Sequence, residues 1–308
     1  MNEYTLAIKR ALAYNWLLLA VNAIVYAALL LSMQEGFIFS VFTFSSIWFI
    51  VGLPMLLPAF ILTNRSNLSL KLFEMFLFFT PWFLAVVLYE NLSGFTAYID
   101  LPLADEPLYA IDVLMFGETP SVYLDPIVTP ALTYFIFAIY VLGYVLPPLL
   151  LGAYIFIQKG RDRFSEYSYG ITMCLLAGFL TFLIVPAIGP IDYYEMLYEN
   201  PLYGETVLSS EIMETVQVYS KNTFPSIHTA LSTLVLLFAF RNNKRIFYIL
   251  IPLTLMIWFS TIYLRQHYFI DLIAGWILAG IIYYCAPFVS SCAKKYGSRI
   301  FGIPTDGT

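Results

Sequence analysis

The stretch IFYILIPLTLMIWFSTIYLRQHYFIDLIAGWILAGIIYYCAPF, residues 246–288, consists of two apolar runs separated by the short polar segment RQHYFID. Each run is about 20 residues long, the length that an α-helix needs to cross the hydrocarbon core of a bilayer. We therefore expect two antiparallel transmembrane helices, over residues 245–265 and 269–293, with the polar segment at one membrane face.

Apolar runs of similar length recur along the whole chain of 308 residues. They predict an all-α integral membrane protein with about eight transmembrane helices. The composition agrees, because 60% of the residues are hydrophobic and only 11% are charged, whereas soluble domains are about 25% charged. The other six predicted spans are residues 11–33, 37–63, 70–90, 126–157, 167–189 and 224–241.

The basic residues support this segmentation. With eight spans, both termini and the loops 64–69, 158–166 and 242–244 fall on one side of the membrane. That side receives 13 of the 15 lysines and arginines, so the positive-inside rule makes it cytoplasmic. The 13 residues are Lys9, Arg10, Arg65, Lys71, Lys159, Arg161, Arg163, Arg241, Lys244, Arg245, Lys294, Lys295 and Arg299.

Three parts follow from this arrangement. Residues 1–66 are expected to form two additional N-terminal transmembrane helices, and residues 294–308 a cytoplasmic tail. Residues 67–293 are expected to form a six-helix core, in which the long connections 91–125 and 190–223 are extracytoplasmic. The first connection is predicted to contain a short helix that begins at Pro107 and is capped by Asp105.

Several classes of protein are disfavoured. The net charge of −5 is uninformative about nucleic acid, and no basic tract supports nucleic acid as a partner. Cys174, Cys285 and Cys292 have no CxxC spacing, so we interpret them as packing residues. A transporter remains an alternative, but it should carry ionisable residues in mid-membrane. Glu74, near the cytoplasmic end of its predicted span, is the one acid clearly inside a span.

The chain has two histidines, and both lie in polar interruptions of apolar runs. His228 is in FPSIHTALS, residues 224–232, at the start of a predicted helix, and His267 follows the next helix. Since those two helices are antiparallel, both histidines are expected at the extracytoplasmic boundary. Asp271 follows His267 by four residues, so its carboxylate can accept the proton of one ring nitrogen if the segment is helical.

The same face is expected to bind an anion. Its two cations, Lys221 and Arg265, both lie close to the histidines in sequence. Asn222 or Thr223 is a candidate cap for the helix that carries His228, whose free N–H groups would then point at a phosphate. Ser226 would add a hydroxyl donor or act as the cap instead.

These residues suit phosphoryl transfer. One histidine attacks phosphorus, the other protonates the leaving oxygen, and the cations stabilise the charge on the remaining oxygens. This chemistry requires no metal or other cofactor. Two histidines and one aspartate could ligate zinc, but a closed site would need a fourth ligand, for which there is no good candidate.

Two segments resemble the signatures of a known family. FPSIHTA, residues 224–230, is similar to the second signature of the type 2 phosphatidic acid phosphatase superfamily, P-S-x-H. STIYLRQHYFIDLIAG, residues 260–275, is similar to its third, S-(x)6-H-(x)3-D. The resemblance is close to the branch that contains inositol phosphorylceramide synthase, the aureobasidin-resistance protein. It is clearest over residues 220–285 and looser over the last six helices, which would form the family's six-helix core.

The resemblance implies a role for each residue. His267 would be the nucleophile that forms a phosphohistidine, Asp271 its orienting carboxylate and His228 the acid that protonates the leaving group. Ser226 and Ser260 would help to hold the phosphate.

The sequence departs from the family in two places. The first signature, K-(x)6-R-P, is not found, and Thr261 stands where an arginine usually follows the serine of the third signature. Arg265 and Lys221 are then the candidate phosphate-binding cations.

These departures favour a head-group transferase, most like an inositol-phosphate transferase, that moves a phosphoryl group from a lipid phosphoester to a lipid alcohol. The alternative within the family is a phosphatase acting on lipid phosphates or polyprenyl phosphates, with water as the acceptor.

Overall fold

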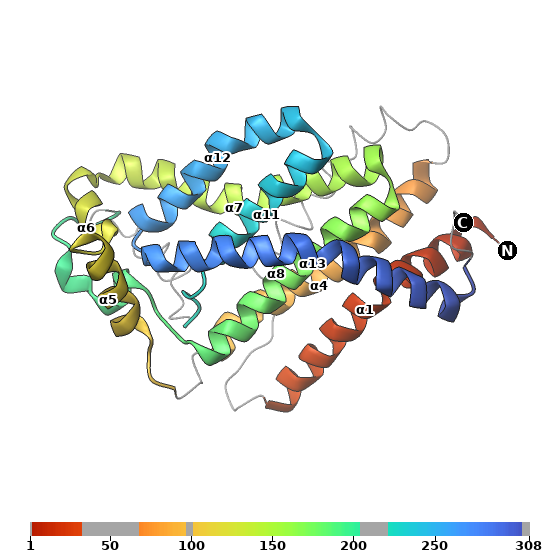
Figure 1. Ribbon diagram of the computed structural model, residues 1–308, viewed down its shortest axis with the longest axis horizontal. Helices are drawn as coiled ribbons and strands as arrows, with labels where there is room; N and C mark the ends of the chain where they lie inside the picture. Colours follow the sequence, from red (N-terminus) through yellow and green to blue (C-terminus); the bar gives the residue numbers. More distant parts are fainter. Residues whose placement is uncertain (1, 33–67, 97–100, 204–220, 304–308) are drawn as a thin grey trace. The chain divides into compact units, whose positions relative to one another are not determined.

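The computed structural model describes residues 2–32, 68–96, 101–203 and 221–303. These residues are mostly helical and contain no strand, as the apolar runs predict (Figure 1). The elements in chain order are α1 (Glu3–Ser32), α4 (Leu68–Thr96), α5 (Asp105–Phe116), α6 (Pro120–Leu124), η1 (Asp125–Ile127), α7 (Pro130–Lys159), α8 (Arg161–Ile184), α9 (Pro190–Tyr193), η2 (Glu195–Leu197), α11 (Ile227–Asn242), α12 (Lys244–Tyr263) and α13 (Phe269–Phe301).

Six of the described helices are long and apolar enough to cross a membrane: α1, α4, α7, α8, α12 and α13. The prediction of a multi-pass, all-α membrane protein is therefore confirmed. Helix α11 is apolar but has 16 residues. At a rise of about 1.5 Å per residue, its length is smaller than the thickness of a hydrocarbon core, roughly 30 Å. The predicted span 37–63 lies outside the described residues, so the count of eight spans stays a prediction.

Several helix boundaries differ from the predicted ones: α1 begins at Glu3 rather than at residue 11, α4 ends at Thr96 rather than at residue 90, and α8 spans Arg161–Ile184 rather than 167–189. Helix α7 begins at Pro130 rather than at residue 126, because Asp125–Ile127 form a 3-10 turn. Helix α5 begins at Asp105, two residues before Pro107. Helix α13 continues to Phe301 instead of ending near residue 293. Its last turns are held in place because Gly297 packs directly against the backbone of α1, where a Cβ atom would collide with the Ala13 carbonyl.

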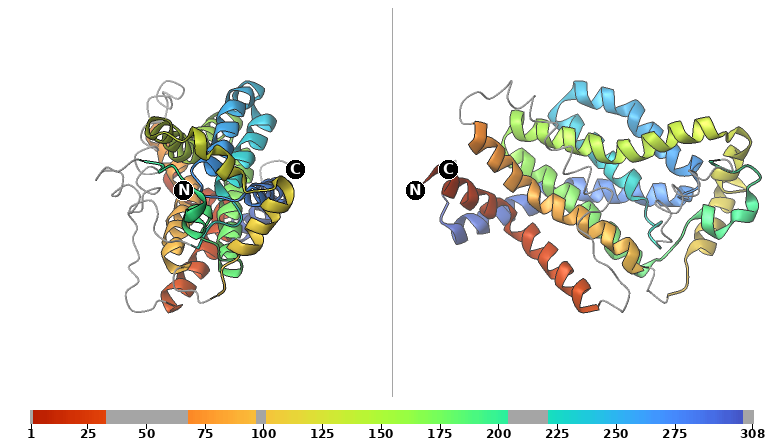
Figure 2. Two further views of the ribbon diagram at one scale, coloured as in Figure 1. Left: turned by 90° about the vertical axis from the view of Figure 1, so that its left-hand side faces the viewer. Right: turned by 180° about the vertical axis from the view of Figure 1, so that it is seen from behind.

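The described residues fall into two compact units. The first unit contains residues 2–32, 68–90, 149–173 and 281–303. The second contains residues 91–96, 101–148, 174–203 and 221–280. Helices α4, α7, α8 and α13 contribute a part to each. Within the second unit, α11 and α12 are joined through Asn243 and run side by side (Figure 2).

Two ion pairs in the first unit join residues that are far apart in the sequence. The Arg161 guanidinium donates to both carboxylate oxygens of Glu74, at 2.6 Å each. Asp162 accepts hydrogen bonds from the Tyr14 hydroxyl at 2.7 Å and from Lys294 at 2.5 Å. The acid that the sequence places inside a span is thus part of a bidentate ion pair that joins two helices. This pairing gives Glu74 a structural role, which weakens the transporter alternative.

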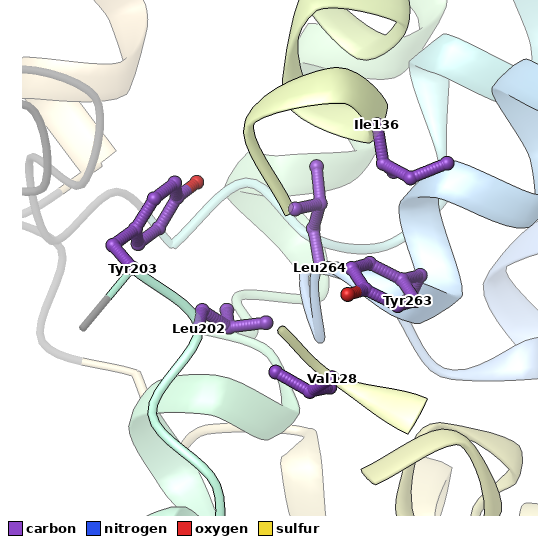
Figure 3. Packing of buried hydrophobic residues seen from close by; sticks show 6 residues of the cluster. All are labelled: Val128, Ile136, Leu202, Tyr203, Tyr263 and Leu264. Carbon is purple, nitrogen blue, oxygen red and sulfur yellow. The ribbon is translucent and has the colours of Figure 1, made fainter. Parts of the chain in front are cut away.

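In the second unit, an apolar cluster surrounds the C-terminal end of α12 (Figure 3). It joins this helix end to the start of α7 and to the segment after η2. Its members are all buried: Val128, Ile136, Leu202, Tyr203, Tyr263 and Leu264. The Tyr263 and Thr133 hydroxyls also lie 3.2 Å apart, within hydrogen-bond distance. This packing determines where the chain leaves α12, just before it reaches His267.

Candidate active site

His267 lies in the short connection between α12, which ends at Tyr263, and α13, which begins at Phe269. The chain leaves α12 through Arg265, whose φ of 58° is left-handed. A left-handed residue just after a helix is a common way to end it, although that residue is usually glycine. An arginine in this conformation has to be held by its surroundings. Its side chain contacts Asp125, Asn200 and Tyr198.

The contact predicted between His267 and Asp271 is present. Nδ1 of His267 lies 3.3 Å from Oδ2 of Asp271, although His267 precedes the helix and only Asp271 is in its first turn. The same Oδ2 accepts a hydrogen bond of 2.9 Å from the backbone N–H of Tyr268. Asp271 is completely buried and His267 is 5% exposed, so the carboxylate can orient the ring without competition from bulk water.

The electrostatic environment of His267 favours a neutral ring. Burial lowers the pKa of His267 to about 3, and a hydrogen bond with the backbone of Thr223 opposes this effect. The ordinary pKa of histidine is about 6.5, so the imidazole is uncharged at neutral pH. A neutral imidazole carries its proton on one ring nitrogen and a lone pair on the other. In the tautomer that donates from Nδ1 to Asp271, the lone pair is on Nε2, as nucleophilic attack requires.

His228 lies close to His267, as the antiparallel arrangement of α11 and α12 predicts. It occupies the first turn of α11, and the centroids of the two imidazole rings are 6.3 Å apart at an interplanar angle of 58°. The two imidazoles are therefore close enough to act on the same small group.

Two tyrosines of α7 pack against the His228 ring, and neither was predicted from the sequence as a site residue. Tyr140 stacks on it with centroids 3.9 Å apart and planes at 19°, and Tyr144 packs against it at 4.4 Å and 37°. Their spacing of four residues places both on one face of α7. That spacing was visible in the sequence, but nothing in the sequence indicated that this face meets α11.

The start of α11 is hydrogen-bonded to the start of α13 and packs closely against it. The backbone N–H of Ser226 donates to the Asp271 carbonyl at 3.1 Å, and Gly275 lies so close that a Cβ atom there would be 2.7 Å from the Ser226 carbonyl oxygen. The Ser226 hydroxyl accepts from the Thr229 N–H at 3.3 Å, so Ser226 is the N-cap of α11. The prediction of Asn222 or Thr223 as the cap was wrong, and the phosphate-binding role of Ser226 stays a prediction.

Ser260 is fully buried in the last turns of α12. Its hydroxyl donates to the Ile257 carbonyl at 2.7 Å, and the hydroxyl of the neighbouring Thr261 donates to the Trp258 carbonyl at the same distance. These bonds within the helix occupy both hydroxyl protons. A role for Ser260 in holding phosphate stays a prediction.

Arg265 is engaged in a buried ion pair that the sequence did not indicate. Its Nη2 donates to Oδ1 of Asp125 at 2.5 Å and to the Asn200 carbonyl at 2.7 Å. The guanidinium also lies over the Tyr198 ring, 4.1 Å from its centroid. These contacts join the α12–α13 connection to η1 and to the segment after η2. Binding of phosphate by Arg265 or by the half-buried Lys221 stays a prediction.

Replacing Asp125 by alanine is expected to lower the free energy of unfolding by about 3–5 kcal/mol, because Arg265 would remain buried without its counter-charge. The measurement is the midpoint of thermal unfolding in detergent, with Glu195→Gln as the control, an exposed acid in the neighbouring 3-10 turn. An unchanged midpoint would contradict the stabilising role of this ion pair.

Asp105 has a role other than the predicted one. The N-cap of α5 is Ala104, without a side-chain hydrogen bond, so the expectation that Asp105 caps the helix was wrong. Its carboxylate instead accepts from the backbone N–H groups of Ile188 and Gly189, at 3.0 and 2.8 Å. Ile188 and Gly189 lie in a turn that is distant in sequence from Asp105. Their N–H groups need hydrogen-bond acceptors, and the Asp105 carboxylate provides them.

In the part of the chain that the structure describes, no group of three or more His, Cys, Asp or Glu residues is arranged to hold a metal ion. The two histidines and Asp271 therefore do not form a closed metal site among these residues. Independence from metal ions stays a prediction about the reaction, to be tested with a chelator.

Three curated proteins are similar to this chain. They are the inositol phosphorylceramide synthase catalytic subunit AUR1 of Saccharomyces cerevisiae, 24% identical over 219 residues, the inositol phosphorylceramide synthase of Candida albicans, 22% over 262 residues, and the phosphoinositol dihydroceramide synthase of Bacteroides thetaiotaomicron, 27% over 201 residues. The matches cover 64%, 79% and 56% of this chain. They span 53%, 55% and 64% of the relatives, so the chain corresponds to little more than half the length of the fungal proteins.

No solved structure matches the chain significantly. The family model of the PAP2 superfamily matches residues 126–285, which is more than half of the chain. The matched segment includes His228, His267 and Asp271, and the three relatives carry names of the branch that the two signatures resemble. The chain therefore belongs to the PAP2 superfamily.

Proposed function

We propose that this protein is a membrane-embedded lipid phosphotransferase that transfers a phosphorylated head group, most like inositol phosphate, from a phospholipid to a lipid alcohol. The observation that carries this proposal is the pairing of His267, which contacts the Asp271 carboxylate, with His228, whose ring centre is 6.3 Å away. The names of the three relatives, all of them synthases of phosphoinositol-bearing ceramides, favour transfer over hydrolysis.

The first half of the reaction breaks the donor ester. Nε2 of His267 attacks the phosphorus atom, and the bond from phosphorus to the oxygen of the diacylglycerol part breaks. His228, which the anionic phosphate group of the bound donor favours in its protonated form, donates its proton to that oxygen, so diacylglycerol leaves as a neutral alcohol. The head group remains on His267 as a phosphodiester-like phosphohistidine, and Asp271 stabilises the ring that carries it.

The second half reverses these roles. The hydroxyl oxygen of the acceptor lipid attacks phosphorus, and the now neutral His228 takes its proton as a general base. The bond between phosphorus and His267 breaks, and its electron pair returns to the imidazole. With water as the nucleophile, the same steps would release a free phosphorylated head group, which is the phosphatase alternative.

We place this site at the extracytoplasmic face and both termini in the cytoplasm. The support comes from the charges along single helices. Helix α12 begins with Lys244 and Arg245 and ends beside His267, and α13 begins beside the same residue and reaches Lys294 and Lys295. By the positive-inside rule, the basic ends lie in the cytoplasm and the histidine ends on the opposite side.

We further propose that residues 67–293 form the catalytic six-helix core, with residues 1–66 as two added spans and 294–308 as a cytoplasmic tail. The segment matched by the family model, 126–285, lies within this core. All the candidate site residues also lie within it.

The test is head-group transfer by the purified chain in detergent, with phosphatidylinositol as donor and either ceramide or diacylglycerol as acceptor, and EDTA present throughout. Phosphatidic acid and polyprenyl phosphates are supplied in parallel. We expect transfer to a lipid hydroxyl that is insensitive to EDTA. Release of free phosphate or inositol phosphate without transfer would establish the phosphatase, and no reaction with any of these substrates would contradict the enzymatic proposal.

A further inference from the structure

Helix α5, which lies in the connection between α4 and α7, carries two completely buried acids, Asp105 and Asp112. They are seven residues apart and so share one face of the helix. Within the described ranges neither of them takes part in a salt bridge, and a buried carboxylate without a cation is rare unless hydrogen bonds satisfy it. Both carboxylates accept hydrogen bonds, and each accepts at least one from the residues that follow His267.

Asp112 caps the helix that follows His267. Its Oδ2 accepts from the Phe269 N–H at 2.8 Å and its Oδ1 from the Ile270 N–H at 3.1 Å. These N–H groups belong to the first turn of α13, where the helix itself offers no acceptor. The Thr119 hydroxyl donates to Oδ2 at 2.9 Å and fixes the carboxylate in this orientation.

Asp105 holds the residue next to the nucleophile. Its Oδ1 accepts from the Tyr268 hydroxyl at 3.0 Å, in addition to the two backbone N–H groups at Ile188 and Gly189. The Tyr268 ring is fully buried and packs with Leu108 of α5 in a small apolar cluster. The peptide N–H of Tyr268 also donates to Asp271, so the position of this residue sets the distance between His267 and its carboxylate.

His267 itself lies in no helix, so nothing regular in the backbone keeps its ring beside Asp271. The residues after it are held by α5 at three points, namely the side chain of Tyr268 and the N–H groups of Phe269 and Ile270. Displacement of a reacting group by about 1 Å can lower a rate about 100-fold. The contacts of α5 therefore bear directly on the geometry of attack.

We infer that Asp105 and Asp112 are positioning residues of the transfer reaction, which hold the His267 segment in its attacking geometry while touching no substrate. This inference rests on the proposed function. It gives α5, a helix outside the segment that the family model matches, a role in the reaction. Replacing Asp105 or Asp112 should therefore affect the rate of attack on phosphorus more than the binding of the donor.

The test compares Asp112→Ala, Asp112→Asn and Asp105→Asn with wild type, and uses Glu106→Gln as the matched control because that acid is adjacent to Asp105 but exposed. Rates of phosphoenzyme formation are measured in a single turnover, per molecule of folded protein, together with kcat and KM for transfer. We expect Asp112→Ala to lower kcat about 100-fold and Asp112→Asn about 10-fold, since asparagine keeps one acceptor oxygen. KM should change less than about twofold and Glu106→Gln should equal wild type.

Tyr268→Phe supplies a milder variant in case the aspartate variants do not fold, because it deletes one hydroxyl. We expect its kcat to fall about fivefold at unchanged KM. Wild-type values of kcat for both Asp112→Asn and Tyr268→Phe would overturn the inference and leave the proposed function intact. A loss that appears only in KM, or only in the folded fraction, would also overturn it. A wild-type protein that transfers no head group would instead overturn the proposed function.

Discussion

Replacing His267 by glutamine is expected to lower the rate of head-group transfer by at least about 10⁴-fold, because removal of a covalent nucleophile eliminates the bond on which both half-reactions depend. Glutamine is similar in length and polar, so the buried position beside Asp271 can still be filled. Transfer is measured with labelled phosphatidylinositol and a lipid alcohol at saturating concentrations, per molecule of folded protein.

The matched control for this variant is Gln266→Ala, which changes the preceding residue. The Gln266 side chain bonds only weakly to the Leu264 carbonyl, at 3.4 Å, and its removal is expected to change the rate less than about threefold. A His267→Gln protein that folds and retains more than a few per cent of wild-type transfer would exclude a phosphohistidine at this position.

Replacing His228 by glutamine is expected to lower the rate of phosphoenzyme formation about 10²- to 10⁴-fold with the natural donor, since an alkoxide would then have to leave without a proton. The defect should depend on the leaving group. With a donor analogue that releases nitrophenolate, which needs no proton, the same variant is expected to approach the wild-type rate to within about tenfold.

Thr233→Val serves as the control on α11, because the hydroxyl of this half-buried residue donates to the Thr229 carbonyl of its own helix. Its rate should match that of wild type with both donors. An equal loss with both donors in His228→Gln would contradict an acid role and would instead indicate that the ring, which packs against Tyr140 and Tyr144, shapes the site.

The proximity of the two histidines could be predicted from the sequence. Apolar runs define the helices, and the short connection through Asn243 makes α11 and α12 antiparallel. The beginning of the first helix and the end of the second must then lie at the same face. The contact between His267 and Asp271 followed from a spacing of four residues, and it holds even though His267 precedes the helix.

The partners of Asp105 could not be predicted in the same way. An acid at the start of a helix commonly caps that helix, and the local sequence is the same whether it does so or not. In this chain its carboxylate bonds to Gly189, 84 residues away, and to the Tyr268 hydroxyl, 163 residues away. Tertiary packing determines which buried N–H groups lack an acceptor, and no short sequence pattern indicates which groups these are.

Arg265 illustrates the same difficulty for cations. Its position two residues before His267 indicated a phosphate ligand, but its guanidinium is paired with Asp125, 140 residues earlier in the chain. A charged side chain that becomes buried takes the nearest counter-charge available in the fold. Sequence spacing identifies which charges lie near a site along the chain but does not identify the groups to which they bind.

The most direct test of the phosphohistidine mechanism is to trap the intermediate. The wild-type protein is mixed with phosphatidylinositol labelled at phosphorus, without acceptor, and denatured within one turnover. We predict one label per chain, bound to His267, stable in base, lost in acid and discharged when a lipid alcohol is added before denaturation. A wild-type protein that transfers the head group at full rate but never carries the label, or that carries it on another residue, would contradict the mechanism.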